Sequence, residues 1–144
     1  MIREITSADY EQLMALYMYL HETEVPPFSQ VKPVWEHILA DENYHIIVAE
    51  EDGQIVSSCT CVVVPNLTRG GRPYARVENV VTRSDYRGRG LATACLNYAK
   101  ELAVKAGCYN IALMTSSKNE STLKFYENAG YDPKEKTGFI QWLW

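Results

Sequence analysis

Hydrophobic and polar side chains follow two periods along this chain. Apolar runs with the period of a strand occur at 2–5, 44–49, 54–64, 74–82 and 109–115, and a final β segment starts at Tyr131 and includes 138–144. Apolar residues three or four positions apart predict a first helix after Thr6, with Leu13, Leu16, Tyr17 and Leu20 on one face, and further helices at 33–40, 91–106 and 120–128. This order of elements predicts an α/β fold with helices on both faces of a mixed sheet.

Capping and turn residues mark several boundaries of these elements. Thr6 is expected to cap the first helix, and Asp9 stands three residues later, where it supports the first turn. Two prolines within 25–28 break the chain before the second helix. The pair Asp52-Gly53 is typical of a tight hairpin, so the two strands that flank it are expected to be antiparallel neighbours.

The segment between the strand at 74–82 and the helix at 91–106 contains Arg87-Gly88-Arg89-Gly90. Glycine allows the backbone to approach a ligand closely. The free N–H groups of a helix's first turn point outward at the positive end of its dipole, and such an arrangement binds phosphate. The segment therefore predicts a site for an anionic, nucleotide-like cofactor.

Composition and charge narrow the class of protein. With 144 residues, 47% hydrophobic and 22% charged, the chain is expected to form one domain over residues 1–144 with a single substantial core. A net charge of −4 argues against a nucleic-acid partner. Arg3 and Glu4 interrupt the N-terminal apolar run, so no signal peptide is expected, and no apolar stretch is long enough for a bilayer. We therefore expect a cytoplasmic protein with no membrane partner.

The four cysteines, Cys59, Cys61, Cys95 and Cys108, do not have the spacing of a zinc site. Reduced thiols that serve as packing groups are the expected state in a cytosolic protein. No metal site is predicted.

Three segments resemble, in order and spacing, motifs of the GNAT superfamily of acyl-CoA-dependent N-acyltransferases. One is Arg87-Gly88-Arg89-Gly90-Leu91-Ala92, which is similar to the pyrophosphate motif Arg/Gln-x-x-Gly-x-Gly/Ala. Another is the strand before it, Glu78-Asn79-Val80-Val81-Thr82. The third is Asn119 followed by 125–131, which resembles the signature Asn…(Phe/Leu)-Tyr-x-x-x-Gly-(Phe/Tyr). The resemblance covers essentially the whole chain.

This resemblance implies the GNAT fold, with a mixed, mostly antiparallel central sheet that splays open between the fourth strand, 74–82, and the fifth, 109–115. Within the superfamily, residues 78–82 and 106–109 look most like glucosamine-phosphate N-acetyltransferases. Asn79 departs from the acidic residue that those enzymes often carry at this position, which leaves the acceptor open.

The resemblance also implies acetyl-CoA as co-substrate. Its pantetheine arm would pair with the backbone of Val80 and Thr82 in the gap of the sheet, and its pyrophosphate would rest on the N–H groups of 88–93. The implied coenzyme-binding residues are Val80, Val81, Thr82, Arg87, Gly88, Arg89, Gly90, Leu91, Ala92, Thr93, Asn119 and Tyr126.

Acetyl transfer from a thioester to an amine needs a neutral amine, donors for the oxyanion and a proton for the thiolate. By resemblance, the N–H of Val81 would polarise the thioester, Tyr126 would donate to the departing sulfur, and Asn119 would bind pantetheine and hold the helix that presents Tyr126. Glu78 is the leading candidate for the base, because its place on the central strand would desolvate it. The alternative for Glu78 is an ion pair with Arg76 or Arg83.

The predicted function is an N-acetyltransferase that moves an acetyl group directly from acetyl-CoA to a primary amine of a small molecule. The alternatives are a protein or peptide N-acetyltransferase and a non-catalytic acetyl-CoA-binding regulatory domain. Two sets of charges leave the acceptor open. An anionic acceptor would bind Arg69, Arg72, Lys118 and Lys136, and a cationic one would bind Glu22, Glu24 and Glu36.

Trp142 and Trp144 lie on the last expected strand, at an edge of the sheet. An exposed apolar edge strand is an aggregation risk unless something covers it. This placement favours a homodimer that uses the edge.

Overall fold

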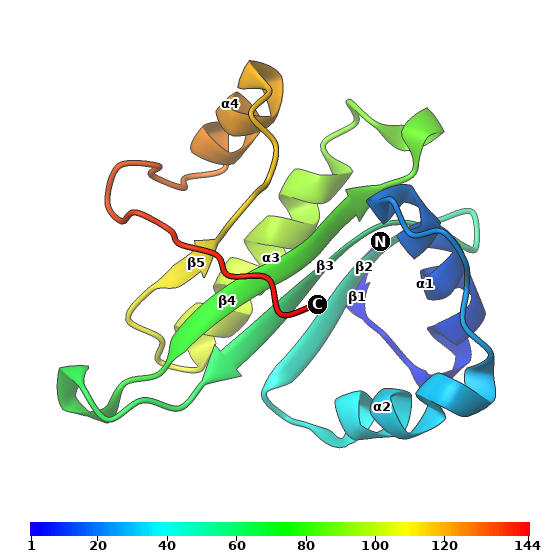
Figure 1. The fold of residues 1–144 in the computed structure, drawn as a ribbon, viewed down its shortest axis with the longest axis horizontal. Coiled ribbons are helices and arrows are strands. Elements are labelled where there is room, and N and C mark those ends of the chain that lie inside the picture. The colour runs from blue at the N-terminus through cyan, green and yellow to red at the C-terminus, as the bar shows by residue number, and fades with distance from the viewer.

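The computed structural model describes all 144 residues of the chain. Its centre is a five-stranded sheet with the strand order β1-β2-β3-β4-β5 (Figure 1). The strands are β1 (Ile2–Glu4), β2 (Tyr44–Glu51), β3 (Gln54–Val64), β4 (Tyr74–Thr82) and β5 (Ile111–Leu113). Neighbouring strands are antiparallel except β4 and β5, which are parallel. The mixed, mostly antiparallel sheet expected from the sequence is confirmed.

Helices cover both faces of this sheet, so that there are two cores (Figure 1). The larger core lies between the sheet and α3 (Leu91–Lys105), where Leu96 and Cys95 pack against strand residues. The smaller core lies on the other face, beneath α1 (Tyr10–Tyr17) and α2 (Phe28–Ala40). The fourth helix, α4 (Glu120–Asn128), contributes Phe125 and Tyr126 to the edge of the larger core. Short 3-10 turns complete the chain: η1 (Ser7–Asp9), η2 (Met18–Leu20), η3 (Arg69–Gly71) and η4 (Ser84–Tyr86).

The hairpin between β2 and β3 forms where the sequence predicts it. Asp52 and Gly53 both have left-handed backbone angles, with φ of 51° and 76°. A two-residue turn of this kind matches the twist of the flanking strands and requires positive φ at both positions. The turn brings Glu51 opposite Gln54, and a register shift between Ala49 and Glu50 then places Ile47 opposite Cys59.

Two expectations about element boundaries are wrong. The second helix begins at Phe28 and not at 33, and Pro33 lies inside it. Proline removes one intrahelical hydrogen bond, and burial of the apolar face outweighs that loss: the indole of Trp35 is 7% exposed and lies edge-on to Tyr10, with ring centroids 5.4 Å apart.

The expected final β segment is the second correction. Residues 131–144 form no strand, although 138–144 carry an alternating pattern. The fifth strand is also shorter than the expected 109–115. Alternation predicts which side chains share a face, but a strand forms only where a neighbouring strand pairs with its backbone. Within one chain, no strand pairs with residues 131–144. None of the helices is long and apolar enough to cross a membrane.

A buried ion pair ties β1 to the first turn of the helical segment. The expected capping box is confirmed, because Thr6 and Asp9 bind each other's backbone N–H groups. Asp9 is 6% exposed, and its carboxylate accepts two hydrogen bonds from the Arg3 guanidinium, at 2.7 and 3.0 Å. These bonds from Arg3 are the main reason that the pKa of Asp9 is lowered.

The substitution Asp9→Asn is expected to reduce the free energy of unfolding by about 2–3 kcal/mol, because it removes the charged acceptor of two Arg3 hydrogen bonds and leaves Glu50 as the one carboxylate bound to that guanidinium. Because the pKa of Asp9 is lowered in the folded protein, the ionised carboxylate stabilises the fold fully above the ordinary pKa of Asp. This stabilisation is lost as pH falls toward the lower pKa that Asp9 has in the folded protein. Urea unfolding at neutral and acidic pH measures both effects. The control is Asp85→Asn, which breaks the exposed Arg83–Asp85 pair and should change stability little. Equal effects of the two substitutions would contradict the prediction.

Candidate active site

The parallel pairing of β4 with β5 covers only one end of β4. Register pairs join Ala75 to Ile111 and Val77 to Leu113, and beyond Val77 the edge of β4 that faces β5 has no strand partner. After β5 the chain leaves β4 and continues to α4 (Figure 1). The splayed sheet expected from the resemblance is therefore present, and it leaves half of a central strand with free hydrogen-bonding groups.

A β-bulge lies where the open half of β4 begins. Thr60 of β3 is opposite Glu78, and Ser58 is opposite Val81, so that one residue of β3 faces two residues of β4. Asn79, one of these two residues of β4, has a φ of 53°. A bulge of this kind bends the strand and reverses the direction in which the following backbone groups point.

This reversal decides which N–H groups face the gap. The N–H of Ala75 donates to β5, and that of Arg83 donates to Val56 of β3. Because backbone groups alternate along a strand, Val81 points toward β3 as Arg83 does, and Val80 and Thr82 point toward the gap. The expected pairing of pantetheine with Val80 and Thr82 stays compatible with the structure. Within the 80–82 strand expected to supply the thioester-polarising N–H, the geometry favours Val80 over Val81, because the N–H of Val81 lies on the β3 side. The side chain of Val81 packs in the smaller core.

The turn after β4 presents an unbroken series of free N–H donors. The N–H groups of residues 87–93 make no hydrogen bond within the protein, and the first bond of α3 runs from Ala94 to Gly90, at 3.0 Å. Gly88 and Gly90 have φ of 77° and 78°, which only glycine adopts without strain. Free donors at the positive end of a 15-residue helix form a site for phosphate.

The two arginines of this turn are positioned by the protein itself. Arg87 donates from Nε to the carbonyl oxygen of Thr82 at 3.3 Å. Arg89 donates to the carbonyl oxygen of Asp85 at 3.2 Å and lies 4.5 Å above the ring of Tyr86. Tyr86 was not singled out from the sequence, where its place beside two basic residues was the only available signal. Its ring also stacks under Arg83, 4.8 Å away, so it fixes two cations beside the free N–H groups.

Tyr126 lies on α4, on the far side of the gap from α3. It lines a cavity of about 580 Å³ between α3, β5 and α4, together with Leu96 and Leu113. Burial raises the pKa of its phenol, so the hydroxyl stays protonated at neutral pH. Asn119 caps α4, because its side chain accepts from the N–H of Ser121 at 2.9 Å. Its expected role in holding the helix that carries Tyr126 agrees with this cap.

Glu78 does not have the desolvated environment expected of it. Its side chain is 45% exposed, and its carboxylate binds Arg76, with contacts of 2.7 and 2.9 Å. The alternative considered from the sequence, an ion pair with Arg76, is therefore the one observed. Tyr44 is a close neighbour that the sequence did not indicate. Burial raises the pKa of its phenol, and the charge of Glu78 adds to the shift.

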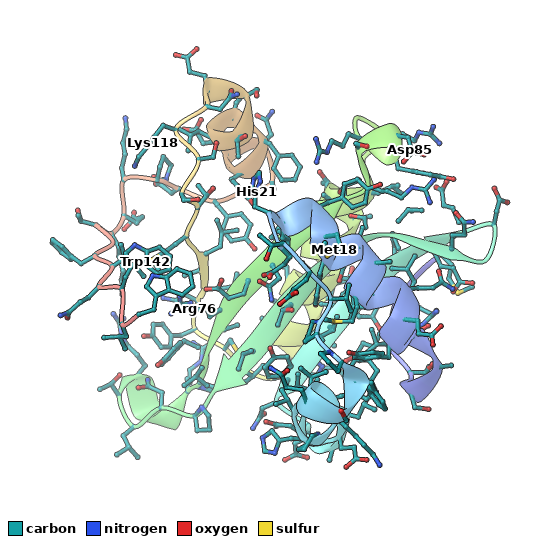
Figure 2. The ribbon with its side chains drawn as sticks, turned by 45° about the vertical axis from the view of Figure 1, so that its right-hand side comes forward. Met18, His21, Arg76, Asp85, Lys118 and Trp142 are labelled. Atoms are coloured by element: carbon teal, nitrogen blue, oxygen red, sulfur yellow. The ribbon has the colours of Figure 1, made fainter.

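A second, smaller cavity of about 190 Å³ opens beside the bulge. Asn79 contributes to it from β4, and Met14, Tyr17 and Met18 contribute from α1 and η2. Met18 is labelled in Figure 2. The other residues that line it, from η2 and the following segment, are Leu20, Glu22, Glu24, Val25 and Pro26. The cavity thus combines apolar walls with two exposed carboxylates at the site where β4 changes direction.

The basic residues considered for an anionic acceptor lie elsewhere. Arg72 is occupied by the carbonyl oxygens of Gly107 and Cys108, at 3.0 and 3.1 Å. Arg69 lies over the ring of Tyr109, 5.1 Å away. Neither Lys118 nor Lys136 lines the small cavity. The structure therefore does not bring these four cations together beside the bulge.

The cysteines are reduced and mostly buried, and they form no metal site. Burial raises the pKa of Cys61 and of Cys95 to about 11, and it raises that of Cys59 further. Protonated thiols inside the core cannot act as acyl carriers, because the thiolate is the nucleophile. No group of three or more His, Cys, Asp or Glu side chains in the structure is placed to hold a metal ion.

Comparison with known proteins agrees with this geometry. The model of the acetyltransferase (GNAT) family matches residues 3–131. The glucosamine 6-phosphate N-acetyltransferase of Trypanosoma brucei brucei is 34% identical over 122 residues, which are 81% of this chain and 79% of that protein. A solved structure from Agrobacterium tumefaciens str. C58, assigned to the acetyltransferases, superposes with a TM-score of 0.93 at 35% identity, over 99% of both chains.

The fold likeness extends to more distant proteins. An aminoglycoside N-acetyltransferase solved in complex with CoA has a TM-score of 0.76 at 19% identity, over 99% of each chain. A family match over most of the chain and a relative at 34% identity agree with the splayed sheet and the free N–H groups at α3. The chain belongs to the GNAT family of acetyltransferases.

Proposed function

We propose that the protein transfers an acetyl group from acetyl-CoA directly to the primary amine of a small molecule. The observation that carries this proposal is the run of unpaired N–H groups at residues 87–93, which follows the open half of β4 along the chain. Together they provide hydrogen-bond donors for a pyrophosphate and an unpaired strand edge for an amide-containing chain. A relative of the same fold is known in complex with CoA.

The coenzyme is proposed to lie along β4 with its pyrophosphate at α3. The N–H groups of 88–93 bind the phosphate oxygens, and Arg87 and Arg89 add positive charge. Pantetheine amides pair with the carbonyl oxygen of Val80 and with Thr82, whose backbone groups face the gap, so that the N–H of Val80 stays free for the thioester. This direction of binding brings the thioester toward the bulge, between Tyr126 and the small cavity.

The chemical step forms a C–N bond and breaks a C–S bond. The amine attacks the thioester carbonyl, and the N–H of Val80 stabilises the developing oxyanion. The Tyr126 hydroxyl donates a proton to the departing sulfur. Glu78 accepts the proton that the amine loses, directly or through water.

The small cavity beside the bulge is the proposed acceptor site. Glu22 and Glu24 attract a positively charged, amine-bearing molecule, and the methionine and tyrosine side chains of α1 and η2 contact its apolar part. A polyamine or an aminosugar with several amines fits this combination of charge and shape.

The proposal is tested by measuring free-thiol release from acetyl-CoA with a panel of amines and an amine-free control. The panel contains glucosamine 6-phosphate, glucosamine, polyamines, an aminoglycoside, amino acids and a lysine peptide. Amine-dependent release with a small-molecule class supports the proposal and names the acceptor. Release with the lysine peptide alone would instead indicate a peptide N-acetyltransferase. Acetyl-CoA binding without release for any amine would indicate a regulatory domain.

Glu78→Gln is expected to lower kcat/KM by about 10²-fold and to remove the low-pH limb of its pH profile, because an amide accepts no proton. The matched control is Arg76→Gln, which breaks the same ion pair but keeps the carboxylate. If Arg76→Gln lowered activity as much, or if Glu78→Gln left the profile unshifted, Glu78 would have no role as a base.

A further inference from the structure

A buried serine of β3 lies behind the open half of β4. The register places Ser57 opposite Thr82, at the end of β4, and opposite Ala49 of β2. Because Ala49 belongs to the larger core, the side chain of Ser57 lies on the face of the sheet that α3 covers. Ser57 is fully buried. A buried hydroxyl is costly unless it is hydrogen-bonded, so its partners indicate what it does.

The Ser57 hydroxyl makes two hydrogen bonds, and both go to the end of β4. Its Oγ donates to the carbonyl oxygen of Val81 at 3.0 Å. The second bond joins Ser57 Oγ to Thr82 Oγ1 at 2.8 Å. Because the single hydrogen of the Ser57 hydroxyl is used on Val81, the Thr82 hydroxyl is the donor in this second bond. The orientation of the serine hydroxyl is therefore fixed by a donor and an acceptor together.

The carbonyl that Ser57 binds belongs to the same peptide unit as the N–H of Thr82. A trans peptide unit is planar, so its C=O and N–H point in opposite directions, and the chain has no cis peptide bond. The carbonyl oxygen of Val81 is held on the β3 side by Ser57, and the N–H of Thr82 therefore points into the gap. No strand faces this N–H, because the pairing with β5 ends at Val77.

The next peptide unit along the strand is held at both of its polar groups. Its N–H, from Arg83, donates to the carbonyl oxygen of Val56 at 2.9 Å. Its C=O, from Thr82, accepts from the Nε of Arg87 at 3.3 Å. Of the two backbone groups that Thr82 directs into the gap, the carbonyl is thus bound within the protein and the N–H is left for a ligand.

We infer that Ser57 is a positioning residue for acetyl-CoA, because it holds the peptide unit whose N–H, at Thr82, donates to the pantetheine arm. Donation to a carbonyl also polarises its peptide unit, so the N–H at the other end becomes a stronger donor. Ser57 acts through the strand and does not touch the coenzyme. The thioester is placed at Val80, so Ser57 affects binding of the coenzyme and not the chemical step. The inference rests on the proposed acetyl-CoA site.

The first test measures the Kd of acetyl-CoA by calorimetry. Ser57→Ala is expected to raise this Kd by about 3- to 10-fold, the size of one hydrogen bond, with a matching rise in KM and little change in kcat. The matched control is Ser58→Ala. Ser58 is equally buried and donates to the carbonyl oxygen of Ile47 at 2.8 Å, on the side of β3 away from the gap. Both variants should lose similar thermal stability, but Ser58→Ala should keep the Kd of the unchanged chain.

Hydrogen exchange at the Thr82 amide tests where the effect arises. At saturating acetyl-CoA this amide should be protected in the unchanged chain and in Ser58→Ala, and less protected in Ser57→Ala. An unchanged Kd in Ser57→Ala, or equal weakening in both variants, would overturn the inference and leave the proposed function standing. A Thr82 amide that bound acetyl-CoA does not protect would do the same. An unchanged chain that binds no acetyl-CoA would overturn the proposed function and the inference together.

Discussion

Replacing Tyr126 with Phe is expected to lower kcat by about 10²-fold or more, the range that a general acid contributes, and to leave the Kd for acetyl-CoA unchanged. The substitution removes one hydroxyl and keeps the ring, which packs against Phe125 with centroids 5.0 Å apart. Without the hydroxyl, the thiolate departs with no proton donor. Steady-state kinetics together with calorimetric binding of acetyl-CoA separate the two effects.

The pH dependence sharpens this prediction. Burial raises the pKa of Tyr126 above its ordinary value, and the group acts as an acid only while it is protonated. Activity should therefore persist on the alkaline side until pH approaches that raised pKa. The matched control is Tyr131→Phe: this phenol is also buried, its pKa is raised to about 12, and its ring centroid lies 6.5 Å from that of Tyr126. Equal losses in both variants would indicate a packing role for Tyr126.

Gly90→Ala is expected to weaken acetyl-CoA binding by about 10- to 100-fold, the equivalent of one lost hydrogen bond to a charged group at about 1.5–3 kcal/mol. Gly90 precedes α3 with a φ of 78°, and a Cβ there would meet no protein atom. In the proposed complex, the pyrophosphate of acetyl-CoA occupies the space that this Cβ would enter. If the backbone moved to relieve the strain of alanine at positive φ, the adjacent N–H groups would turn away from the pyrophosphate.

A second glycine separates strain from binding. Gly107 follows the other end of α3 with a φ of 81°, and its Cβ would also meet nothing. Gly107→Ala therefore brings a similar left-handed strain, about 1–2 kcal/mol, at a position away from the phosphate site. It should lower thermal stability to the same extent as Gly90→Ala and leave the Kd unchanged. If both variants lost affinity equally, the free N–H groups at 87–93 would not form the phosphate site.

Local signals in the sequence predicted most of the elements. The hairpin at Asp52-Gly53, the capping box at Thr6 and the strand-to-helix turn at 87–90 formed as expected, because each depends on residues within a few positions of one another. The sequence led us to expect a single core, whereas the sheet divides the buried apolar residues into two. The phosphate-binding turn at 87–93 could be predicted from local sequence alone, because the first N–H groups of any helix lack partners within that helix.

Features that depend on long-range pairing were not predictable. The helix at 28–40 tolerates Pro33 because Trp35 finds a buried site, which no local rule reveals. The alternating pattern at 138–144 gives no strand, because it has no partner within one chain. The orientation of the backbone at 80–82 is a further long-range feature: Asn79 forms a bulge opposite β3, and this insertion changes which of Val80 and Val81 faces the gap.

The burial of the cysteines has a consequence for the chemistry of turnover. The proposed reaction releases coenzyme A, a thiol that forms mixed disulfides with accessible protein thiolates under oxidising conditions. Cys61 and Cys95, whose pKa values are raised to about 11, hold almost no thiolate at neutral pH and lie inside the core. The packing that fills the sheet therefore shields these core thiols from the thiol product, and Cys108, which is only partly buried, is the cysteine left open to it.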